Sequence, residues 1–290
     1  MNVLVTGGAG FVGTNLIKKL LKAGHSVVSL DDYSTGYVEN HVEGCTYHNY
    51  SIEDIDGHES FASNKYDLIY HLAGLSRIQP SFNNPTQTFA VNTSGTQRVL
   101  ELARKLQVKV VYAGSSSKHH DPYQSPYATF KYLGEEICKM YKKTYDMDIE
   151  ICRFYNVYGP HEVTDGDWAA VIGIWRTQIK NNLPLTIVGD GEQKRDFTHV
   201  DDIVAGLMKV GFSEHKHEDA WELGCGRNYS INQVANWFVE YGGGTKKYIE
   251  DQPGNYRETL RESDEALEIL GWQPQDRLEN YIKSLYDLKD

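Results

Sequence analysis

The chain has 290 residues, a formal net charge of −11, and ordinary fractions of hydrophobic (40%) and charged (24%) residues. This length suits one large domain or two closely packed domains, and an acidic chain without a basic stripe is not expected to bind nucleic acid. No apolar run could span a bilayer, no secretory signal precedes the first strand, and the four cysteines lie far apart without zinc-ligand spacing, so we expect a cytoplasmic protein with no membrane partner and no metal site.

The first elements in the chain are a strand, a glycine-rich turn, a helix and a second strand. Residues 3–5 are a short apolar run rich in β-branched residues, which is typical of a buried parallel strand. From Phe11 the apolar residues recur at helical spacing, and this helix is expected to end before Gly24. Residues 26–30 are a second apolar run and predict the next strand.

Three glycines lie in the turn between the first strand and the helix: Gly7, Gly10 and Gly13. The first permits a tight turn, the second lets the backbone approach a pyrophosphate, and the third allows the helix to pack closely on the strand. The phosphates would lie at the helix N-terminus, where unpaired N–H groups point outward. Asp31 ends the second strand, where a carboxylate accepts hydrogen bonds from a ribose 2′-hydroxyl and repels a 2′-phosphate. The pattern therefore predicts NAD rather than NADP as the cofactor.

Strands and helices continue to alternate up to residue 154. Further strands are predicted at residues 46–50, 67–71, 108–113 and 149–154, and helices at residues 85–105 and 126–145. This alternation is typical of a parallel, doubly wound sheet, so we expect an α/β fold of the Rossmann type. Ligands bind such sheets beyond the carboxyl ends of the strands.

The pattern changes after residue 155, where prolines and glycines divide the chain into short pieces. We expect residues 1–155 to form an NAD-binding domain. Residues 156–290 are expected to form a smaller α/β domain that caps the sheet, binds the substrate and is interleaved with the first domain. A last pair of helices is expected to end near Leu288.

A tyrosine and a lysine four residues apart, Tyr127 and Lys131, share one face of the predicted helix 126–145. A phenol has a pKa of about 10, which a nearby ammonium and a positively charged nicotinamide would lower. The phenolate could then take a proton from a substrate hydroxyl as hydride leaves the carbon. Hydroxyls at the end of the preceding strand could bond the same oxygen, and the register allows Ser115 or Ser116 in this role.

Short segments along nearly the whole chain resemble the motifs of one enzyme family. They are, in order, TGGAGFVG, DDYSTG, HLAG, VNTSGT, SSS, SPYATFK, RFYNVYGP, VGDGEQKRDFTHVDDI and LGWQP. The set resembles the nucleotide-sugar epimerase/dehydratase group of extended short-chain dehydrogenase/reductases, and within it most resembles the UDP-glucose/UDP-N-acetylglucosamine 4-epimerases. The resemblance implies bound NAD, a UDP-sugar substrate, and a homodimer that pairs through the two long helices.

The resemblance also implies roles for individual residues. On the cofactor side they are Gly7, Gly10, Phe11, Val12 and Gly13 at the pyrophosphate, Asp31 and Asp32 at the adenosine end, Leu72, Ala73 and Gly74 along the cleft, and Asn92, Tyr127 and Lys131 near the nicotinamide. On the substrate side they are Asn156 at the nucleotide diphosphate, Arg195 and Arg257 as phosphate contacts, and Thr259 beside the sugar. A surface ion pair with Asp196 or Asp201 is the alternative for Arg195.

Two positions depart from the usual motifs of the family. Gln252 stands where many relatives have a phosphate-binding arginine, so Arg257 would take over part of that contact. The loop at residues 118–125 is shorter than usual, so the pocket wall on that side is expected to be reshaped. The resemblance places Thr259 at a position that gates the size of the sugar in the epimerases. A tyrosine there would exclude a 2-N-acetyl group, whereas threonine implies room for UDP-GlcNAc and UDP-GalNAc in addition to UDP-glucose and UDP-galactose.

Members of this group first oxidise a sugar hydroxyl to a ketone with NAD, and they differ in the next step. Dehydratases carry an Asp-Glu pair and decarboxylases a glutamate just after the catalytic hydroxyl residue, whereas here no carboxylate follows Ser117 until Asp121. Return of the hydride to the opposite face, which is 4-epimerisation, is therefore favoured. The alternatives are a nucleotide-sugar 4,6-dehydratase, an epimerase of another nucleotide sugar, and a non-catalytic NAD-sensing protein, against which Tyr127 and Lys131 argue.

Overall fold

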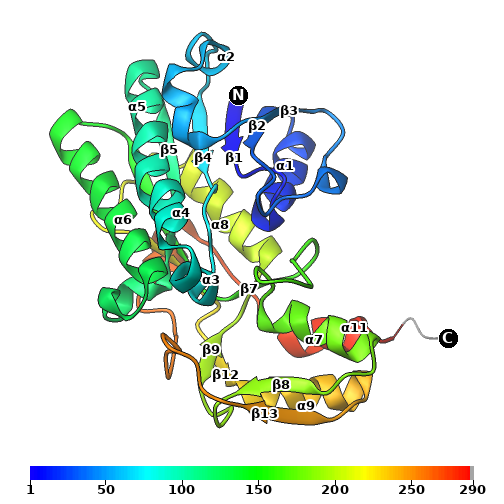
Figure 1. The fold of residues 1–290 in the computed structure, drawn as a ribbon. Helices are drawn as coiled ribbons and strands as arrows, with labels where there is room; N and C mark the ends of the chain where they lie inside the picture. The colour runs from blue at the N-terminus through cyan, green and yellow to red at the C-terminus, as the bar shows by residue number, and fades with distance from the viewer. Residues whose placement is uncertain (288–290) are drawn as a thin grey trace.

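The large lobe is built on a seven-stranded sheet in the computed structural model, which describes residues 1–287 (Figure 1). The strand order is β11-β6-β5-β4-β1-β2-β3, and every pairing is parallel. The strands are β1 (Asn2–Thr6), β2 (Ser26–Asp31), β3 (Cys45–Asn49), β4 (Leu68–His71), β5 (Lys109–Ser115), β6 (Ile149–Phe154) and β11 (Trp221–Leu223). The order reverses between β1 and β4, which is where doubly wound sheets bind their ligands. The predicted Rossmann-type α/β fold is thus confirmed.

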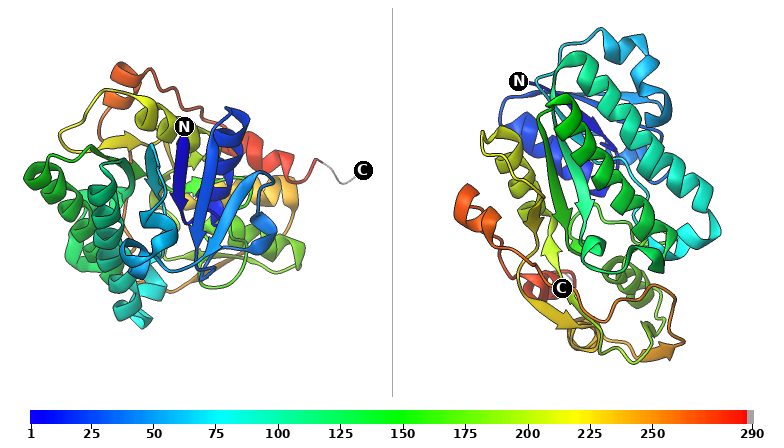
Figure 2. Two further views of the ribbon diagram at one scale, coloured as in Figure 1. Left: turned by 90° about the horizontal axis from the view of Figure 1, so that it is seen from above. Right: turned by 90° about the vertical axis from the view of Figure 1, so that its left-hand side faces the viewer.

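Helices cover both faces of this sheet (Figure 2). One apolar core joins the sheet to α5 (Thr96–Leu106) and α6 (Pro126–Tyr145), and a second core joins the opposite face to α1 (Phe11–Lys22), α8 (Val200–Phe212) and α10 (Glu265–Leu270). The short helices of this lobe are η1 (Val38–Asn40), η2 (Ile52–Gly57), α2 (Glu59–Ala62), α3 (Ile78–Asn83), η4 (Ser116–His119) and η5 (Pro122–Gln124). Because both faces are buried, the central strands carry apolar residues on both sides.

The segment predicted as one helix from 85 to 105 is helical throughout but not uniform. It consists of α4 (Pro85–Phe89), a π-helical stretch η3 (Ala90–Gly95) and α5. A π turn inserts one extra residue, and apolar periodicity over so short a stretch does not reveal it. The insertion matters for the site because it contains Asn92, whose contacts are described below.

The small lobe has three two-stranded pairings around its own apolar core. Its strands are β7 (Val157–Tyr158), β8 (Leu185–Val188), β9 (Lys194–Asp196), β10 (Thr198–His199), β12 (Asn228–Ser230) and β13 (Lys246–Ile249). Its helices are α7 (Val171–Lys180), α9 (Ile231–Gly242) and α11 (Leu278–Ser284). A capping box of Ser230 and Gln233 begins α9.

The chain passes between the lobes more than once after residue 155. From the small lobe it returns to the sheet through α8 and β11, because β11 pairs with β6. The last segment is tied to the large lobe by Trp272, a buried residue whose Nε1 donates to the Asp202 carbonyl (2.8 Å). The domain boundary after residue 155 stays a prediction. The expected final helix pair corresponds to α10 and α11, while Leu288 lies outside the described residues.

Three further observations concern residues 1–287 as a whole. The four cysteines are free thiols. Within this range, His, Cys, Asp and Glu side chains do not gather into groups of three that could hold a metal ion. None of the helices in this part of the chain has both the length and the apolar character that crossing a membrane requires.

Candidate active site

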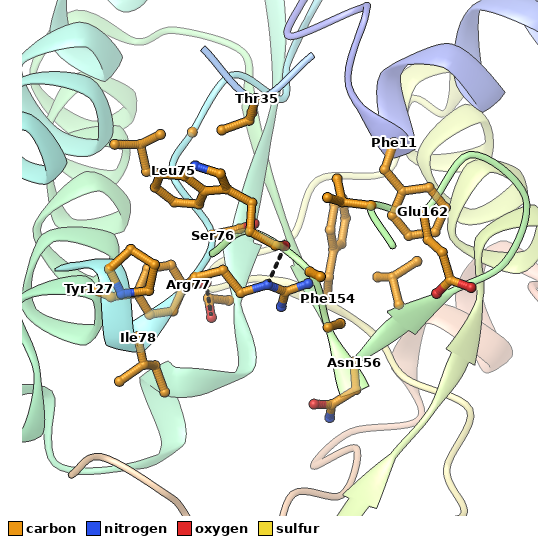
Figure 3. Close-up of a pocket in the computed structure, with 18 of the residues that line it drawn as sticks. Phe11, Thr35, Leu75, Ser76, Arg77, Ile78, Tyr127, Phe154, Asn156 and Glu162 are labelled. Atoms are coloured by element: carbon orange, nitrogen blue, oxygen red, sulfur yellow. Dashed lines mark hydrogen bonds between the residues drawn. The ribbon is translucent and has the colours of Figure 1, made fainter. Parts of the chain in front are cut away.

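A cleft of about 720 Å³ lies where the carboxyl end of the large sheet meets the small lobe (Figure 3). Its volume falls within the range of small-molecule sites. Its walls come from the loops after β1, β2, β4 and β5, from α6, and from residues of the small lobe such as Ile231 and Ile249. The cleft is therefore where the fold class predicts a ligand.

The glycine-rich turn forms one end of the cleft and leaves the start of α1 open. Gly7 has φ +73°, and a Cβ there would lie 2.8 Å from the Ala73 nitrogen. A Cβ at Gly13 would collide with the Gly7 carbonyl oxygen. Gly10 is the N-cap of α1 and supplies no side chain to bond the first N–H groups, and the first turn carries no acidic residue. The backbone N–H groups at the start of α1 are thus available to an anion in the cleft.

Asp31 is buried at the end of β2, where it lines the cleft and holds the glycine turn in place. Its Oδ2 accepts from the Ala9 N–H (2.8 Å) and its Oδ1 from the Tyr33 N–H (2.9 Å). Burial raises the pKa of this carboxyl, and the two backbone bonds act in the opposite direction. Asp32 also lines the cleft and accepts from Ser34. Both acids retain lone pairs that could accept from ribose hydroxyls.

The floor of the cleft follows β4. Leu72, Ala73 and Gly74 line it, as expected. Asn92 does not line the cleft: its Oδ1 accepts from the Leu75 N–H (2.8 Å) and its Nδ2 donates to the Leu75 carbonyl (2.9 Å). In this structure Asn92 therefore acts on the cleft indirectly, by holding the backbone that follows β4.

Tyr127 enters the cleft from the first turn of α6. Ser125 caps this helix by accepting from the Ala128 N–H (3.1 Å), and the Tyr127 N–H donates to Ser81 Oγ (3.1 Å). The Tyr127 hydroxyl then donates to Ser115 Oγ (3.2 Å) at the end of β5. The backbone of α6 and the end of β5 thus fix the phenol within the cleft.

The structure distinguishes the two candidate serines. Ser115 Oγ accepts from Tyr127 and also from the Ser117 N–H (3.2 Å) and the Ser117 hydroxyl (2.9 Å). Ser116 lines the cleft but makes no hydrogen bond to Tyr127. Ser115 is therefore the partner of the phenol, and Ser117, which was not among the predicted residues, supports it.

Lys131 lies one helical turn after Tyr127 and does not contact its hydroxyl. Its Nζ donates to the Tyr112 hydroxyl (3.0 Å) and to the Ala113 carbonyl (2.5 Å). Burial lowers the pKa of Lys131 to about 8, against the attraction of Glu135. Burial also raises the pKa of Tyr127, although the Ser115 bond and the charge of Arg77 oppose that rise. Lys131 is not among the groups that shift the pKa of Tyr127 here, so the lowering of that pKa by the lysine together with a bound nicotinamide stays a prediction.

The substrate-side residues are divided between the cleft and the outer surface. Asn156, Arg195 and Thr259 line the cleft, and Asn156 Nδ2 donates to Thr259 Oγ1 (3.0 Å). Arg195 is not ion-paired with Asp196 or Asp201; its Nη2 donates to Asn255 Oδ1 (2.7 Å), and burial lowers its pKa to about 10.

Arg257 does not line the cleft. Its side chain is 68% exposed and pairs with Asp190 (2.9 Å) on the outer surface. The predicted phosphate contact of Arg257 is therefore not formed from within the cleft, because its guanidinium is engaged by Asp190 on the outer surface.

Arg77 and Trp168 line the cleft and were not among the predicted residues. Arg77 Nε donates to the Trp168 carbonyl (2.8 Å), which links the loop after β4 to the small lobe (Figure 3). The only sequence signal was a basic residue shortly after the carboxyl end of a predicted strand, and such residues are common in loops.

The cleft has the features that NAD requires. The open helix start and the small glycines suit a diphosphate, and the paired acids after β2 suit a ribose. Gly7 and Gly13 leave no space for larger side chains, so the cradle depends on residues that only glycine can supply.

Comparison with known proteins agrees with this geometry. Residues 3–224 match the model of the NAD dependent epimerase/dehydratase family. A UDP-glucose 4-epimerase of Mycolicibacterium smegmatis is 32% identical over 297 residues, which cover 95% of this chain and 94% of the relative.

Two solved structures share the whole fold. The UDP-glucose 4-epimerase of Thermotoga maritima with UDP-glucose has a TM-score of 0.90 and 29% identity, covering 98% of this chain and 96% of that chain. The UDP-glucose 4-epimerase of Thermus thermophilus in complex with NAD has a TM-score of 0.88 and 27% identity, covering 98% of this chain and 97% of that chain.

Proposed function

Since the chain belongs to the NAD-dependent epimerase/dehydratase family and uses NAD as its cofactor, we propose that it inverts carbon 4 of a UDP-sugar. The observation that carries the proposal is the Tyr127 hydroxyl, held 3.2 Å from Ser115 Oγ in a cleft that begins at the glycine turn. The same chemistry in an M. smegmatis relative of nearly equal length supports it.

In the proposed reaction, bound NAD would supply the acceptor for the hydride of carbon 4 and the donor for its return to the opposite face. Tyr127 takes the proton of the 4-hydroxyl in the oxidation and gives it back in the reduction. Ser115 orients the phenol and can donate to the same sugar oxygen. The backbone N–H groups at the start of α1 would hold the cofactor diphosphate, and Arg195 would hold the diphosphate of the substrate by charge-assisted hydrogen bonds.

The segment after the serines argues for epimerisation over elimination. The carboxylates that line the cleft are Asp31, Asp32, Glu162 and Asp167, and none of them belongs to residues 118–125, directly after the serines. Lys118 pairs with Glu136 and His119 with Glu222, so the shortened loop turns its charged groups to partners outside the cleft. An acid suited to removing the 6-hydroxyl is therefore missing from this wall.

The test is to incubate the protein and NAD with UDP-glucose, UDP-galactose, UDP-GlcNAc and UDP-GalNAc and to identify the products by NMR. We expect interconversion of 4-epimers, and Y127F to lower the rate about 100-fold or more with NAD still bound. Tyr132, on the same helix but outside the cleft, provides the control Y132F. A 4-keto-6-deoxy product would favour the dehydratase, and bound NAD without turnover of any nucleotide sugar would favour a sensing role.

We also propose that Thr259 admits a 2-N-acetyl group. Thr259 lines the main cleft and an adjoining cavity of about 330 Å³, which it shares with Ser116 and His119. In T259Y the larger ring would fill this space, so the ratio of kcat/KM for UDP-GalNAc over UDP-galactose should fall. T259S keeps the oxygen that bonds Asn156 and serves as control. Turnover of UDP-galactose but not UDP-GalNAc by the unmodified enzyme would contradict the proposal.

A further inference from the structure

The Arg77 side chain lies in the middle of the cleft, on the side of Tyr127. Arg77 is the N-cap residue of α3, so its backbone is fixed between the end of β4 and that helix. Its side chain extends from the neighbourhood of Tyr127 toward Phe154, above Asn156 (Figure 3). Burial raises the pKa of the Tyr127 phenol, and the nearby charge of Arg77 acts in the opposite direction. The guanidinium thus lies where the reacting end of a substrate would be.

The guanidinium has one protein partner and no counter-ion. Its Nε donates to the Trp168 carbonyl (2.8 Å), and no hydrogen bond from either terminal nitrogen to residues 1–287 is present. Across the same residues, no carboxylate lies within ion-pair distance of Arg77. Glu162 is the acid whose charge reaches it, but Glu162 Oε1 accepts from Arg176 (2.8 Å). Because arginine stays protonated in proteins, this partly buried charge faces the cleft without a counter-ion.

The other cationic groups of the cleft already have roles. Lys131 is bonded to the Tyr112 hydroxyl and the Ala113 carbonyl, and Arg195 lies on β9 in the small lobe, where the proposed function places the substrate diphosphate. The start of α1 is assigned to the cofactor diphosphate. Arg77 is therefore the remaining positive charge, and it faces the sugar end of the substrate rather than either diphosphate.

We propose that the sugar of the UDP-sugar substrate carries a carboxylate, which the terminal nitrogens of Arg77 bind. This inference rests on the proposed function and makes nucleotide-sugar acids the preferred substrates over the neutral UDP-sugars. Two parallel N–H groups match the two oxygens of a carboxylate, whereas a neutral hydroxymethyl group offers no charge to compensate the guanidinium. Because the Trp168 carbonyl accepts from Arg77 Nε, the two terminal nitrogens of the guanidinium remain available to a ligand in the cleft.

The test measures binding to the NAD-loaded Y127F protein, so that turnover is not required. Isothermal titration compares two acidic probes with their neutral counterparts: UDP-glucuronic acid with UDP-glucose, and UDP-N-acetylmuramic acid with UDP-GlcNAc. We expect one acidic probe to bind about tenfold or more tightly than its counterpart, since a hydrogen-bonded ion pair is worth that much. The first pair places the carboxylate at carbon 6 and the second places it on an ether substituent. The pair that shows the preference therefore identifies the position of the carboxylate on the sugar.

Substitutions then connect the preference to Arg77. R77Q in the same background should abolish the preference for the acidic probe, and R77K should restore part of it because the charge remains while the fork is lost. R98Q makes the same chemical change at an exposed arginine that pairs with Asp56, and should keep the full preference. Bound NAD, measured for each variant, shows whether the fold and the cofactor site survive.

Two results would overturn the inference. One is equal affinity for acidic and neutral probes, or a preference that R77Q retains. The other is loss of NAD from R77Q and R77K but not R98Q, which would assign the guanidinium to the dinucleotide. Failure of the proposed function would give a different result. The preference for the acidic probe would persist in the binding experiment, but the unmodified enzyme would epimerise neither neutral nor acidic UDP-sugars.

Discussion

At the scale of single residues, the site depends on which hydroxyl the phenol reaches. Ser115 and Ser116 are adjacent in sequence, but Ser115 ends β5 whereas Ser116 begins η4, and only Ser115 bonds the Tyr127 hydroxyl. Ser117 turns back onto Ser115 through two hydrogen bonds and so fixes its hydroxyl. The three hydroxyls therefore have different importance for the reaction.

We predict that S115A lowers kcat about 10- to 100-fold, because the phenol and the sugar oxygen each lose a hydrogen-bond partner. S116A should stay close to the unmodified enzyme. Steady-state rates for both variants at equal NAD content make the comparison. A larger loss in S116A than in S115A would show that the other serine acts in catalysis.

His71 illustrates a residue whose protonation affects stability. It is buried at the end of β4, where its ring nitrogens bond Thr6 (2.8 Å) and Thr96 (3.1 Å), and burial lowers its pKa from 6.5 to about 3. Between these values the unfolded chain binds more protons than the folded one. The free energy of unfolding should therefore fall as the pH decreases from about 6.5 toward 3, with a contribution of up to about 1.4 kcal/mol per pH unit.

H71Q should reduce this acid sensitivity, and the exposed H215Q should leave it unchanged. Urea unfolding at pH 7 and pH 5 measures both. His199, whose pKa burial lowers to about 4, adds an effect of the same sign in every variant. An unaltered difference between the two pH values in H71Q would refute the assignment.

At the scale of elements, the cofactor end of the cleft is set by how closely α1 approaches β1. Gly13 lies in α1 against the backbone of Gly7 and Gly8, and a Cβ there would contact both. This close contact positions the first turn of α1 so that its backbone N–H groups face the cleft. On the substrate side, the Ser125 cap fixes the start of α6 and with it the position of Tyr127.

G13A should therefore weaken NAD binding on the order of 10- to 100-fold, because the start of α1 must shift away from the turn. G24A is the matched control: Gly24 has φ +82° with no atom near its Cβ position, so an alanine should cost about 1 kcal/mol of stability without touching the cofactor. Calorimetric NAD titration and thermal unfolding separate the two effects. Equal NAD affinity in G13A and G24A would contradict this account.

At the scale of the whole molecule, the cleft exists because the chain returns to the sheet. The segment after the small lobe contributes α8 and β11 to the large lobe, and Trp272 then ties the last segment to Asp202. The two lobes are thus joined by several chain crossings rather than one linker. On the outside of the large lobe, α5 and α6 lie side by side (Figure 1). Leu133 and Met140, both on α6, are exposed.

We propose that this outer face pairs two chains into a homodimer, as the family resemblance implies. Sedimentation should then give twice the chain mass of 32.9 kDa. The double variant L133E/M140E should shift the protein toward monomer, because charges would be buried at the contact. I269E, at an exposed position of α10 on the opposite face of the sheet, should leave the dimer intact. A monomer mass for the unmodified chain would exclude the proposal.

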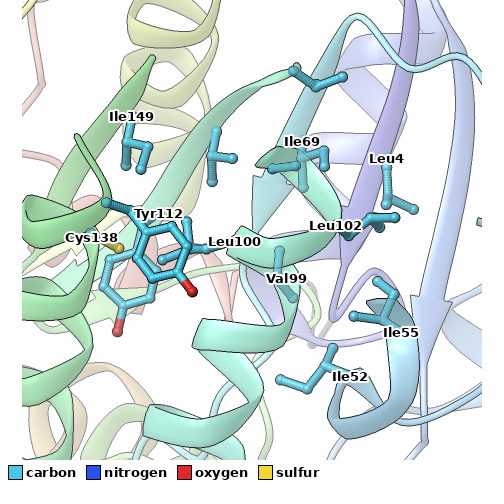
Figure 4. Packing of buried hydrophobic residues seen from close by; sticks show 14 of the residues in the cluster. Leu4, Ile52, Ile55, Ile69, Val99, Leu100, Leu102, Tyr112, Cys138 and Ile149 are labelled. Carbon is cyan, nitrogen blue, oxygen red and sulfur yellow. The ribbon is translucent and has the colours of Figure 1, made fainter. Parts of the chain in front are cut away.

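In the core of the large lobe, Leu4 of β1, Ile69 of β4 and Val99 of α5 belong to one apolar cluster (Figure 4). The alternating apolar runs that make this core were readable from the sequence, since strand and helix periodicity depends on neighbours a few residues apart. The glycine turn and Asp31 were readable for the same reason. The roles of the glycine turn and of Asp31 follow from their places in a strand, turn, helix and strand that are consecutive in the chain.

The rest of the site was decided by contacts between residues far apart in the chain. Only the folded structure placed Arg77 beside Tyr127, turned Arg257 outward to Asp190, and engaged Asn92 with Leu75. Periodicity gives no information about where a loop side chain points, because that direction depends on packing against distant segments. Sequence alone therefore determined the fold class and the cofactor, whereas the tertiary structure decided which charges face the substrate.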